Sequence, residues 1–151
     1  MSPGGKIQIY RSLFKGRDDV IAVRWQSNNS GRSGYSPACH NEWRPGICQK
    51  PGVKCTDCPH QNFEQYTDQA VHSHLTGKRT LGIYPLNQND TCWFLAADFD
   101  KKSWRDEVAA FVQACQANDV SCHREVSRSG NGAHVWIFFS WYARHGHELM
   151  G

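Results

Sequence analysis

Two acidic residues end an apolar segment of the chain with the spacing of a metal-binding pair. Asp98 and Asp100 follow the apolar run 92–97 and are separated by Phe99. Because side chains alternate along a strand, both carboxylates project from one face and Phe99 projects from the other. Such carboxylates are hard oxygen ligands that can share Mg²⁺ or Mn²⁺ with water and substrate phosphates. The alternative is a solvated strand end, which is common for an isolated pair of this kind.

A glycine-rich turn that ends on a histidine follows at residues 127–134. Gly130 and Gly132 allow backbone N–H groups to approach a phosphate closely, and Ser129 adds a hydroxyl donor. His134 opens the next predicted strand and can donate to a phosphate oxygen from the same side. An ordinary hairpin explains the Asn-Gly pair in this turn, but it does not explain the histidine.

Four cysteines lie within twenty positions and supply the full tetrahedral set of a structural zinc site: Cys39, Cys48, Cys55 and Cys58. Without a secretion signal, clustered cysteines indicate a metal more than disulfides, although disulfides or unpaired surface thiols are the alternative. The segment is rich in Pro and Gly, so a bound ion is the feature that can order it. His40 and His60 can substitute as ligands, but exposed imidazoles are favoured. Cys92, Cys115 and Cys122 are interpreted as buried thiols.

The same segment also resembles part of the zinc deaminase signature H-x-E…P-C-x-x-C. His40 and Glu42 would supply its first half, and Cys55 and Cys58 its second half. Only twelve residues separate Glu42 from Cys55, and Lys54 rather than proline precedes that cysteine. The connection is too short for the structure that the signature spans, so we disfavour a deaminase.

The elements that must position these residues can be predicted from periodicity and turn signals. Ser103 with Asp106 indicates a capping box, and Thr67 and Gly77 are expected to begin and end a helix. The continuous apolar run 92–97 is typical of a strand covered on both faces. Polar residues 26–38 predict a loop. Strands are expected at 19–25, 81–86, 92–100, 120–127 and 133–139, and helices at 6–15, 67–77, 103–117 and from 143 onward.

This order of elements predicts an α+β fold in which a helix packs on one face of a sheet. A chain of 151 residues with 39% hydrophobic and 12% aromatic content can bury a core, which excludes disordered and fibrous classes. No apolar run is long enough to span a bilayer. The N-terminus lacks the apolar stretch of a signal peptide, which predicts a cytoplasmic location.

Charge is distributed unevenly along the chain. Residues 1–60 hold nine Lys and Arg against four Asp and Glu, whereas residues 61–151 hold eight against ten. A basic first part suits contact with phosphates, and an acidic second part suits cation binding. An ordinary soluble surface is the alternative, and charge alone favours it.

The strand ending in Asp-X-Asp, the helix, the strand and the SGxGxHxW pattern together resemble the catalytic centre of the archaeo-eukaryotic primase superfamily. The closest likeness is to the primase-like domains of TOTE conflict systems, and it runs from about residue 6 to residue 139. The similar stretches are RSLFKGRDDV, GYSPACHNEW, KCTDCP, GIYPL, TCWFLAADFD and SRSGNGAHVWIFF.

The resemblance implies an RRM-like antiparallel or mixed sheet and a two-metal nucleotidyl transferase that makes or extends primers in DNA replication. Asp98 and Asp100 would bind Mg²⁺ or Mn²⁺, and the turn with Ser129, Gly130, Gly132 and His134 would hold a nucleoside triphosphate. Single-stranded DNA or a primer–template is the expected nucleic-acid partner, with a fused or associated helicase. The expected organisation is a basic segment 1–66, with a zinc knuckle at 39–58, and a partial catalytic core 67–151.

One part of the family pattern has no counterpart in this sequence. The family has a third acidic residue on a later strand, and this chain stops at Gly151 before such a strand. Glu125 and Glu148 are the nearby acids, and neither has the matching context. The expectation is therefore either a fragment that is inactive alone or a reduced protein that binds nucleotide poorly.

A non-catalytic module that binds single-stranded nucleic acid, with a zinc knuckle, is the alternative function. Cations and aromatic residues are interleaved in the basic half, as they are in single-strand binders. Packing of the aromatic residues around the knuckle explains them equally well. The residues concerned are Arg24, Trp25, Arg32, Tyr35, Trp43, Arg44, Lys50 and Lys54.

Overall fold

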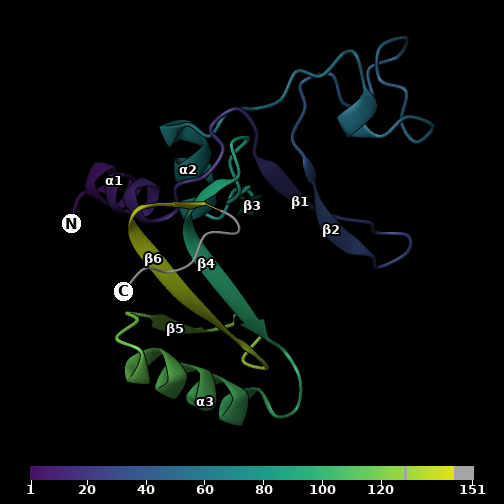
Figure 1. Ribbon diagram of the computed structural model, residues 1–151. Helices are drawn as coiled ribbons and strands as arrows, with labels where there is room; N and C mark the ends of the chain where they lie inside the picture. The colour runs from purple at the N-terminus through teal and green to yellow at the C-terminus, as the bar shows by residue number, and fades with distance from the viewer. Residues whose placement is uncertain (128, 145–151) are drawn as a thin grey trace. The chain divides into compact units, whose positions relative to one another are not determined.

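The computed structural model describes residues 1–127 and 129–144, and the chain divides into two compact units, Met1–Gln88 and Asn89–Gly151. The described residues form a mixed α+β fold with three α-helices and two three-stranded antiparallel sheets (Figure 1). The α+β prediction is confirmed. In this part of the chain no helix is long and apolar enough to cross a membrane.

Helix α1 (Pro3–Leu13) begins earlier than the predicted helix 6–15. The hydroxyl of Ser2 accepts a hydrogen bond from the backbone N–H of Gly5, and proline occupies the first helical position. Both features start a helix, because they satisfy or remove N–H groups that lack intrahelical partners.

Helix α2 (Asp68–Leu75) begins where the sequence predicts. The Thr67 hydroxyl accepts from the backbone N–H of Ala70, which confirms the predicted N-cap. Gly77 follows the helix with a φ of +74°, a left-handed conformation that glycine adopts without steric cost.

The first unit contains a small sheet with the strand order β2-β1-β3. Strand β1 (Ala22–Gln26) pairs antiparallel with β2 (Ser33–Pro37) and with β3 (Leu81–Gly82). The prediction of a loop over 26–38 is therefore wrong, since β2 lies inside it. The predicted strand 81–86 is too long. The buried core of this unit consists of Ile21, Tyr66, Ala70, Val71 and Leu81.

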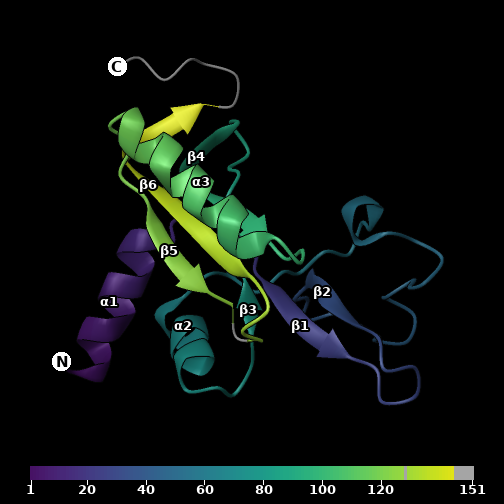
Figure 2. The ribbon, with the colours of Figure 1, turned by 90° about the horizontal axis from the view of Figure 1, so that it is seen from below.

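The second unit contains the sheet β4-β6-β5. Its strands are β4 (Thr91–Phe99), β5 (His123–Val126) and β6 (Ala133–Arg144), and α3 (Trp104–Ala117) lies across one face (Figure 2). The predicted strands and the predicted helix are all present, with shifted ends. The core between helix and sheet consists of Trp104, Val108, Ala133 and Val135.

Three details of the second unit differ from expectation. Ser103 has φ −88° and ψ 9°, so it is not extended as an N-cap is, and its hydroxyl bonds to Glu107; the predicted capping box is wrong. Leu95 is 52% exposed, so the apolar run is not covered on both faces. The helix predicted from 143 onward is wrong at Ala143 and Arg144, which belong to β6, and otherwise lies outside the described residues.

Candidate functional site

The strand pairing places three ionisable side chains in one row across the second sheet. Asp98 of β4 lies opposite His134 of β6, and Glu125 of β5 lies opposite the same histidine. His134 Nε2 is 3.6 Å from Asp98 Oδ1, and its Nδ1 is 3.8 Å from Glu125 Oε2. The middle strand thus presents an imidazole between two carboxylates.

The row lies on the sheet face opposite α3. Phe99 points toward the helix, and the centroid of its ring lies 5.6 Å from that of Phe111. Because side chains alternate along a strand, Asp98 must point to the other face. Trp136 and Phe138 continue along β6 on the face of His134, with parallel rings. The sequence prediction that Asp98 and Phe99 project to opposite faces is confirmed.

The imidazole of His134 is partly exposed, and one of its two nitrogens is buried. Its side chain is 36% exposed, yet Nδ1 is buried and has no hydrogen-bond partner. Glu125 is the carboxylate nearest to that atom, and its Oε2 already accepts from the indole N–H of Trp136 at 3.0 Å. An unpaired buried nitrogen has a free-energy cost unless a partner moves into reach.

The carboxylates are well placed to meet a cation from solvent. The side chain of Asp98 is 69% exposed, and Asp100 is also exposed, directly after the end of β4. Exposed carboxylates can take a hard cation that keeps several water ligands. Across residues 1–127 and 129–144, no group of three or more His, Cys, Asp or Glu side chains is arranged as a complete metal site.

The turn between β5 and β6 has a structural reason for its glycines. A Cβ at Gly132 would lie 2.6 Å from the carbonyl oxygen of Phe99, so only glycine allows the turn to pack against the end of β4. Gly130 has a φ of +73°. The hydroxyl of Ser129 accepts from the backbone N–H of Asn131. These contacts bring the predicted turn and the Asp-X-Asp strand end together.

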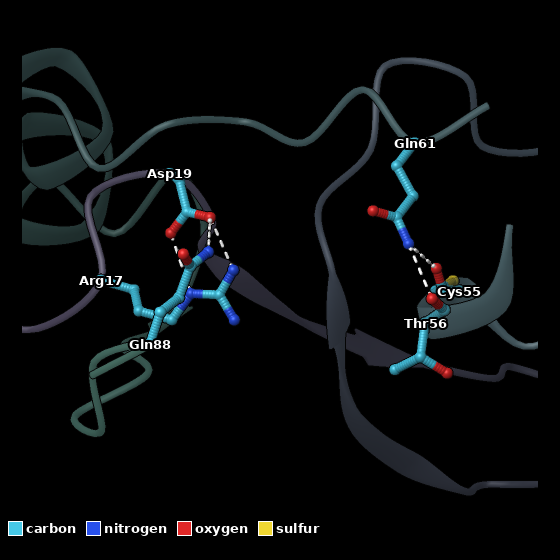
Figure 3. A network of polar contacts seen from close by, with 6 residues as sticks. All are labelled: Arg17, Asp19, Cys55, Thr56, Gln61 and Gln88. Carbon is cyan, nitrogen blue, oxygen red and sulfur yellow. Dashed lines mark hydrogen bonds and ion pairs between the residues drawn. The ribbon is translucent and has the colours of Figure 1, made fainter. Parts of the chain in front are cut away.

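The four clustered cysteines line one small cavity in the first unit, together with Lys50 and His60 among others. We refer to residues 39–63 as the cysteine segment. Its one helical turn is η1 (Cys55–Asp57). The Gln61 side-chain amide donates to the carbonyls of Cys55 and Thr56 at 2.6 and 3.0 Å and so ties this turn to the following chain (Figure 3). All four thiols are free, and zinc binding stays a prediction.

Glu42 is held by a cation rather than left available as an acid or base. Lys50 Nζ donates to Glu42 Oε1 at 2.6 Å. Burial alone would lower the pKa of Lys50, but the hydrogen bond and the charge of Glu42 outweigh it and raise that pKa. This pairing gives Glu42 a structural role and further disfavours the deaminase interpretation.

The other three cysteines lie in the second unit. Cys115 is buried, as predicted, whereas Cys92 and Cys122 are half-buried. Burial, followed by the neighbouring Cys115 thiol, raises the pKa of Cys122. A raised thiol pKa lowers the fraction of reactive thiolate at neutral pH.

Glu125 is the site residue that sequence reasoning set aside. Its own strand gave no reason to select it, because all four residues of β5 are exposed. The hairpin itself indicates the position of Glu125. Ser127 and Gly132 close the turn, so the preceding residue 126 pairs with 133, and Glu125 pairs with His134. Register therefore identifies a residue that composition does not.

The family described as the Archaeo-Eukaryotic Primase domain of the TOTE conflict system matches residues 5–145, which is nearly the whole chain. No curated protein matches the chain.

Proposed function

Because the chain belongs to the family of archaeo-eukaryotic primase domains of TOTE conflict systems, we propose that its second sheet carries a metal-dependent nucleotidyl-transfer site. Membership supports a primase-like core whose substrates are nucleotides and nucleic acid. The finer proposal is template-directed synthesis or extension of a primer. The observation that carries it is the register that sets Asp98 beside His134.

Asp98 and Asp100 would hold the divalent cations of the reaction. A bound Mg²⁺ or Mn²⁺ would neutralise the triphosphate and stabilise the attacking and leaving oxygens. The exposure of both carboxylates fits an ion that keeps water ligands and takes others from the substrate. The chain's own contribution is to fix these carboxylates at the end of a strand that packs on Gly132.

His134 would bind a phosphate of the incoming nucleotide. An imidazole that carries both ring protons can donate from Nδ1 to Glu125 and from Nε2 to a phosphate oxygen. The gap of 3.8 Å between Nδ1 and Glu125 is long for a hydrogen bond, and such contacts often tighten when substrate binds. Glu125 would then orient the ring without touching the substrate.

The turn before His134 would cradle the remaining phosphates. Ser129 and Gly130 are exposed, and the Ser129 hydroxyl can donate to a phosphate oxygen. The backbone N–H of Gly130 instead donates to the Ser127 carbonyl at 2.8 Å and so holds the shape of the turn. Gly132 keeps this turn against β4, so the groups proposed to bind phosphate and the carboxylates lie at the same end of the sheet, where β4 ends and β6 begins.

We further propose that the sheet is RRM-like and that the cysteine segment is a zinc knuckle. One helix across one face of an antiparallel sheet, with aromatic rings on the opposite face, supports the first part. The second part is supported by four thiols lining one cavity, since zinc binds four thiolates tetrahedrally. The donor set fits Zn²⁺, and bound zinc would order residues 39–63.

The test is binding of a fluorescent nucleoside triphosphate in the presence of Mn²⁺. We expect His134→Ala to weaken binding by about 10- to 150-fold, since a hydrogen bond to a charged group contributes about 1.5–3 kcal/mol. Asp98→Ala should abolish the metal dependence. His123→Ala is the matched control, because His123 lies on the same sheet outside the row.

Two outcomes would contradict the proposal. If His134→Ala binds as tightly as the parent while Asn131→Ala does not, the turn alone binds phosphate. If Asp98→Ala leaves nucleotide binding and its metal dependence intact, the site is not a metal-dependent transferase. Primer extension on a single-stranded template, with the Asp98→Ala and Asp100→Ala variants, then tests the chemistry itself.

A further inference from the structure

The first unit contains a second, more open cavity beside the one that the four cysteines line, and Cys39, Glu42 and Lys50 line both. Its volume is about 650 Å³, and residues of β1, β2 and the cysteine segment line it. Val23 and Ala38 are apolar parts of its lining, with Trp25 and Trp43. Lys50 and Arg79 supply cations. This size falls within the range of pockets that bind small organic groups.

The two tryptophans are exposed at this cavity to an unusual degree. Trp43 is 65% exposed and Trp25 is 44% exposed, whereas tryptophan is buried in most folds. Trp43 also has a φ of +59°, in the left-handed region that a bulky side chain rarely adopts. Such a conformation has a free-energy cost and occurs preferentially at functional sites.

The charged groups in the cavity are already paired. Lys50 is bonded to Glu42 at 2.6 Å and its Nζ lies 5.7 Å from the centre of the Trp43 ring. Arg79 is bonded to Glu64. The interior is therefore close to neutral and suits an uncharged planar group. The exposed Arg44, next to the lining residue Trp43 in the chain, suits a phosphate outside it.

We propose that this cavity binds a base of single-stranded DNA, with Trp43 and Trp25 as stacking surfaces and the nearby cations as phosphate contacts. The excess of Lys and Arg over Asp and Glu in residues 1–60 gives the charge complementarity. The inference rests on the proposed function in one respect, namely that nucleic acid is the expected ligand. It needs neither the metal site nor catalysis.

The experiment measures fluorescence anisotropy of a labelled oligothymidine of about 12 nucleotides, a length within the site sizes of single-strand binders. The full chain is used as purified, without nucleoside triphosphate or Mn²⁺. We expect Trp43→Asn to weaken binding about 5- to 150-fold, the effect of losing one base–aromatic stack. Asparagine tolerates the left-handed backbone, so this change removes the ring without adding strain.

Matched variants separate stacking from folding. Trp43→Phe should retain most of the affinity because it keeps an aromatic face, and Trp25→Ser should weaken binding. Tyr35→Ser is the control: Tyr35 is 55% exposed and, by its pairing with Arg24, lies on the other sheet face from Val23. Unchanged thermal unfolding of each variant shows that its fold is retained.

The outcomes distinguish this inference from the proposed function. Oligothymidine binding that survives Asp98→Ala but falls in Trp43→Asn supports the cavity even if nucleotide binding fails. Affinity that is the same in Trp43→Asn, Trp25→Ser and the parent overturns the inference, as does equal loss in Tyr35→Ser. Binding that does not weaken with added salt also overturns it, since phosphate contacts release counterions.

Discussion

The two candidate sites of this protein are built in different ways. In the second unit, the row Asp98–His134–Glu125 is set by backbone pairing between β4, β6 and β5. In the first unit, the cysteine segment has one short helical turn, an isolated backbone bridge between Cys39 and Phe63 at its ends, and side-chain contacts such as Gln61 to Cys55. Sheet register fixes side chains without a ligand, whereas a segment with little regular structure depends on one.

The largest predicted effect concerns the cysteine segment. Cys55→Ser with Cys58→Ser should abolish binding of about one equivalent of zinc and unfold residues 39–63, because these residues rely on the proposed metal for order. Zinc content by metal analysis and hydrogen exchange across the chain measure the two effects. Exchange in β4 and β6 should be unchanged.

The control for this experiment is Cys115→Ser, which changes a buried thiol outside the segment. It should leave zinc content unchanged. A freshly reduced parent chain without zinc would exclude the knuckle. If chelation of zinc also reduced protection from hydrogen exchange in the second sheet, the order of both units would depend on the metal, contrary to the proposal.

The second prediction tests how register fixes the row. Gly132→Ala should destabilise the chain by about 1–3 kcal/mol, the usual cost of overpacking, because the new Cβ meets the Phe99 carbonyl. Nucleotide affinity should fall as well, since the turn moves away from Asp98 and Asp100. Urea unfolding and triphosphate binding provide the measurements.

Gly4→Ala is the matched change, since a Cβ at Gly4 meets nothing within 4 Å and the residue lies in α1. It should be neutral or stabilising, because alanine favours helix over glycine. Equal destabilisation by both changes would show that the close contact at Gly132 has no special role.

The sequence predicted strands and helices best where packing demands were strong. β4 and α3 were predicted closely because an apolar run and a helical period both report burial. β2 was missed because it is an edge strand of polar and small residues, paired only with β1. The capping box failed because the backbone angles of Ser103, which the sequence does not report, are not extended.

The site was predictable to a similar degree. Asp98, His134 and the glycines were selected from local motifs. Their positions at one end of the sheet follow from the pairing of β4 with β6. Glu125 was set aside because its role depends on a cross-strand partner. Trp25, Trp43 and Lys50 were named from the sequence as candidates for binding nucleic acid. That they line one cavity was not predictable, since β1 and the cysteine segment meet there only in the fold.

The third prediction concerns the orienting carboxylate. Glu125→Gln should reduce nucleotide affinity about two- to tenfold, the effect of one modest hydrogen bond, and less than His134→Ala does. Glu125→Asp keeps a carboxylate at this position, so its nucleotide affinity should lie between those of Glu125→Gln and the parent. Isothermal titration with Mn²⁺ and a nucleoside triphosphate measures these affinities.

A structural role for Glu125 would give a different result. Glu125 also accepts from Trp136, so losing that bond alone would lower stability without changing affinity. If Glu125→Gln changes the unfolding midpoint but leaves affinity and the effect of His134→Ala unaltered, Glu125 does not orient the histidine.

The fourth prediction contrasts the thiols of the two units. Burial and the Cys115 thiol raise the pKa of Cys122, so Cys122 should react with iodoacetamide more slowly than an ordinary thiol at neutral pH. After zinc removal, the thiols of the cysteine segment should react first. Mass spectrometry of timed samples identifies the order, and early labelling of Cys122 would contradict it.

The smallest predicted effect concerns Asp19, which belongs to the first unit but lies outside the cysteine segment. Arg17 donates to both of its carboxylate oxygens at 2.8 and 2.6 Å, and Gln88 donates at 3.2 Å (Figure 3). The hydrogen bond from Arg17 lowers the pKa of Asp19. Since the group is exposed, Asp19→Asn should cost only about 0.2–1 kcal/mol.

The pH dependence of that difference has a defined sign. A lowered folded-state pKa stabilises the fold above the ordinary aspartate pKa of about 3.9, and the contribution disappears as pH falls through the lower folded value. The unfolding midpoints of parent and Asp19→Asn should therefore differ at pH 7 and converge in acid, in zinc-free and zinc-loaded protein alike. A difference in midpoint that appears only with zinc would show that the cysteine segment also stabilises the region around Asp19. The dependence on a ligand would then not be confined to residues 39–63.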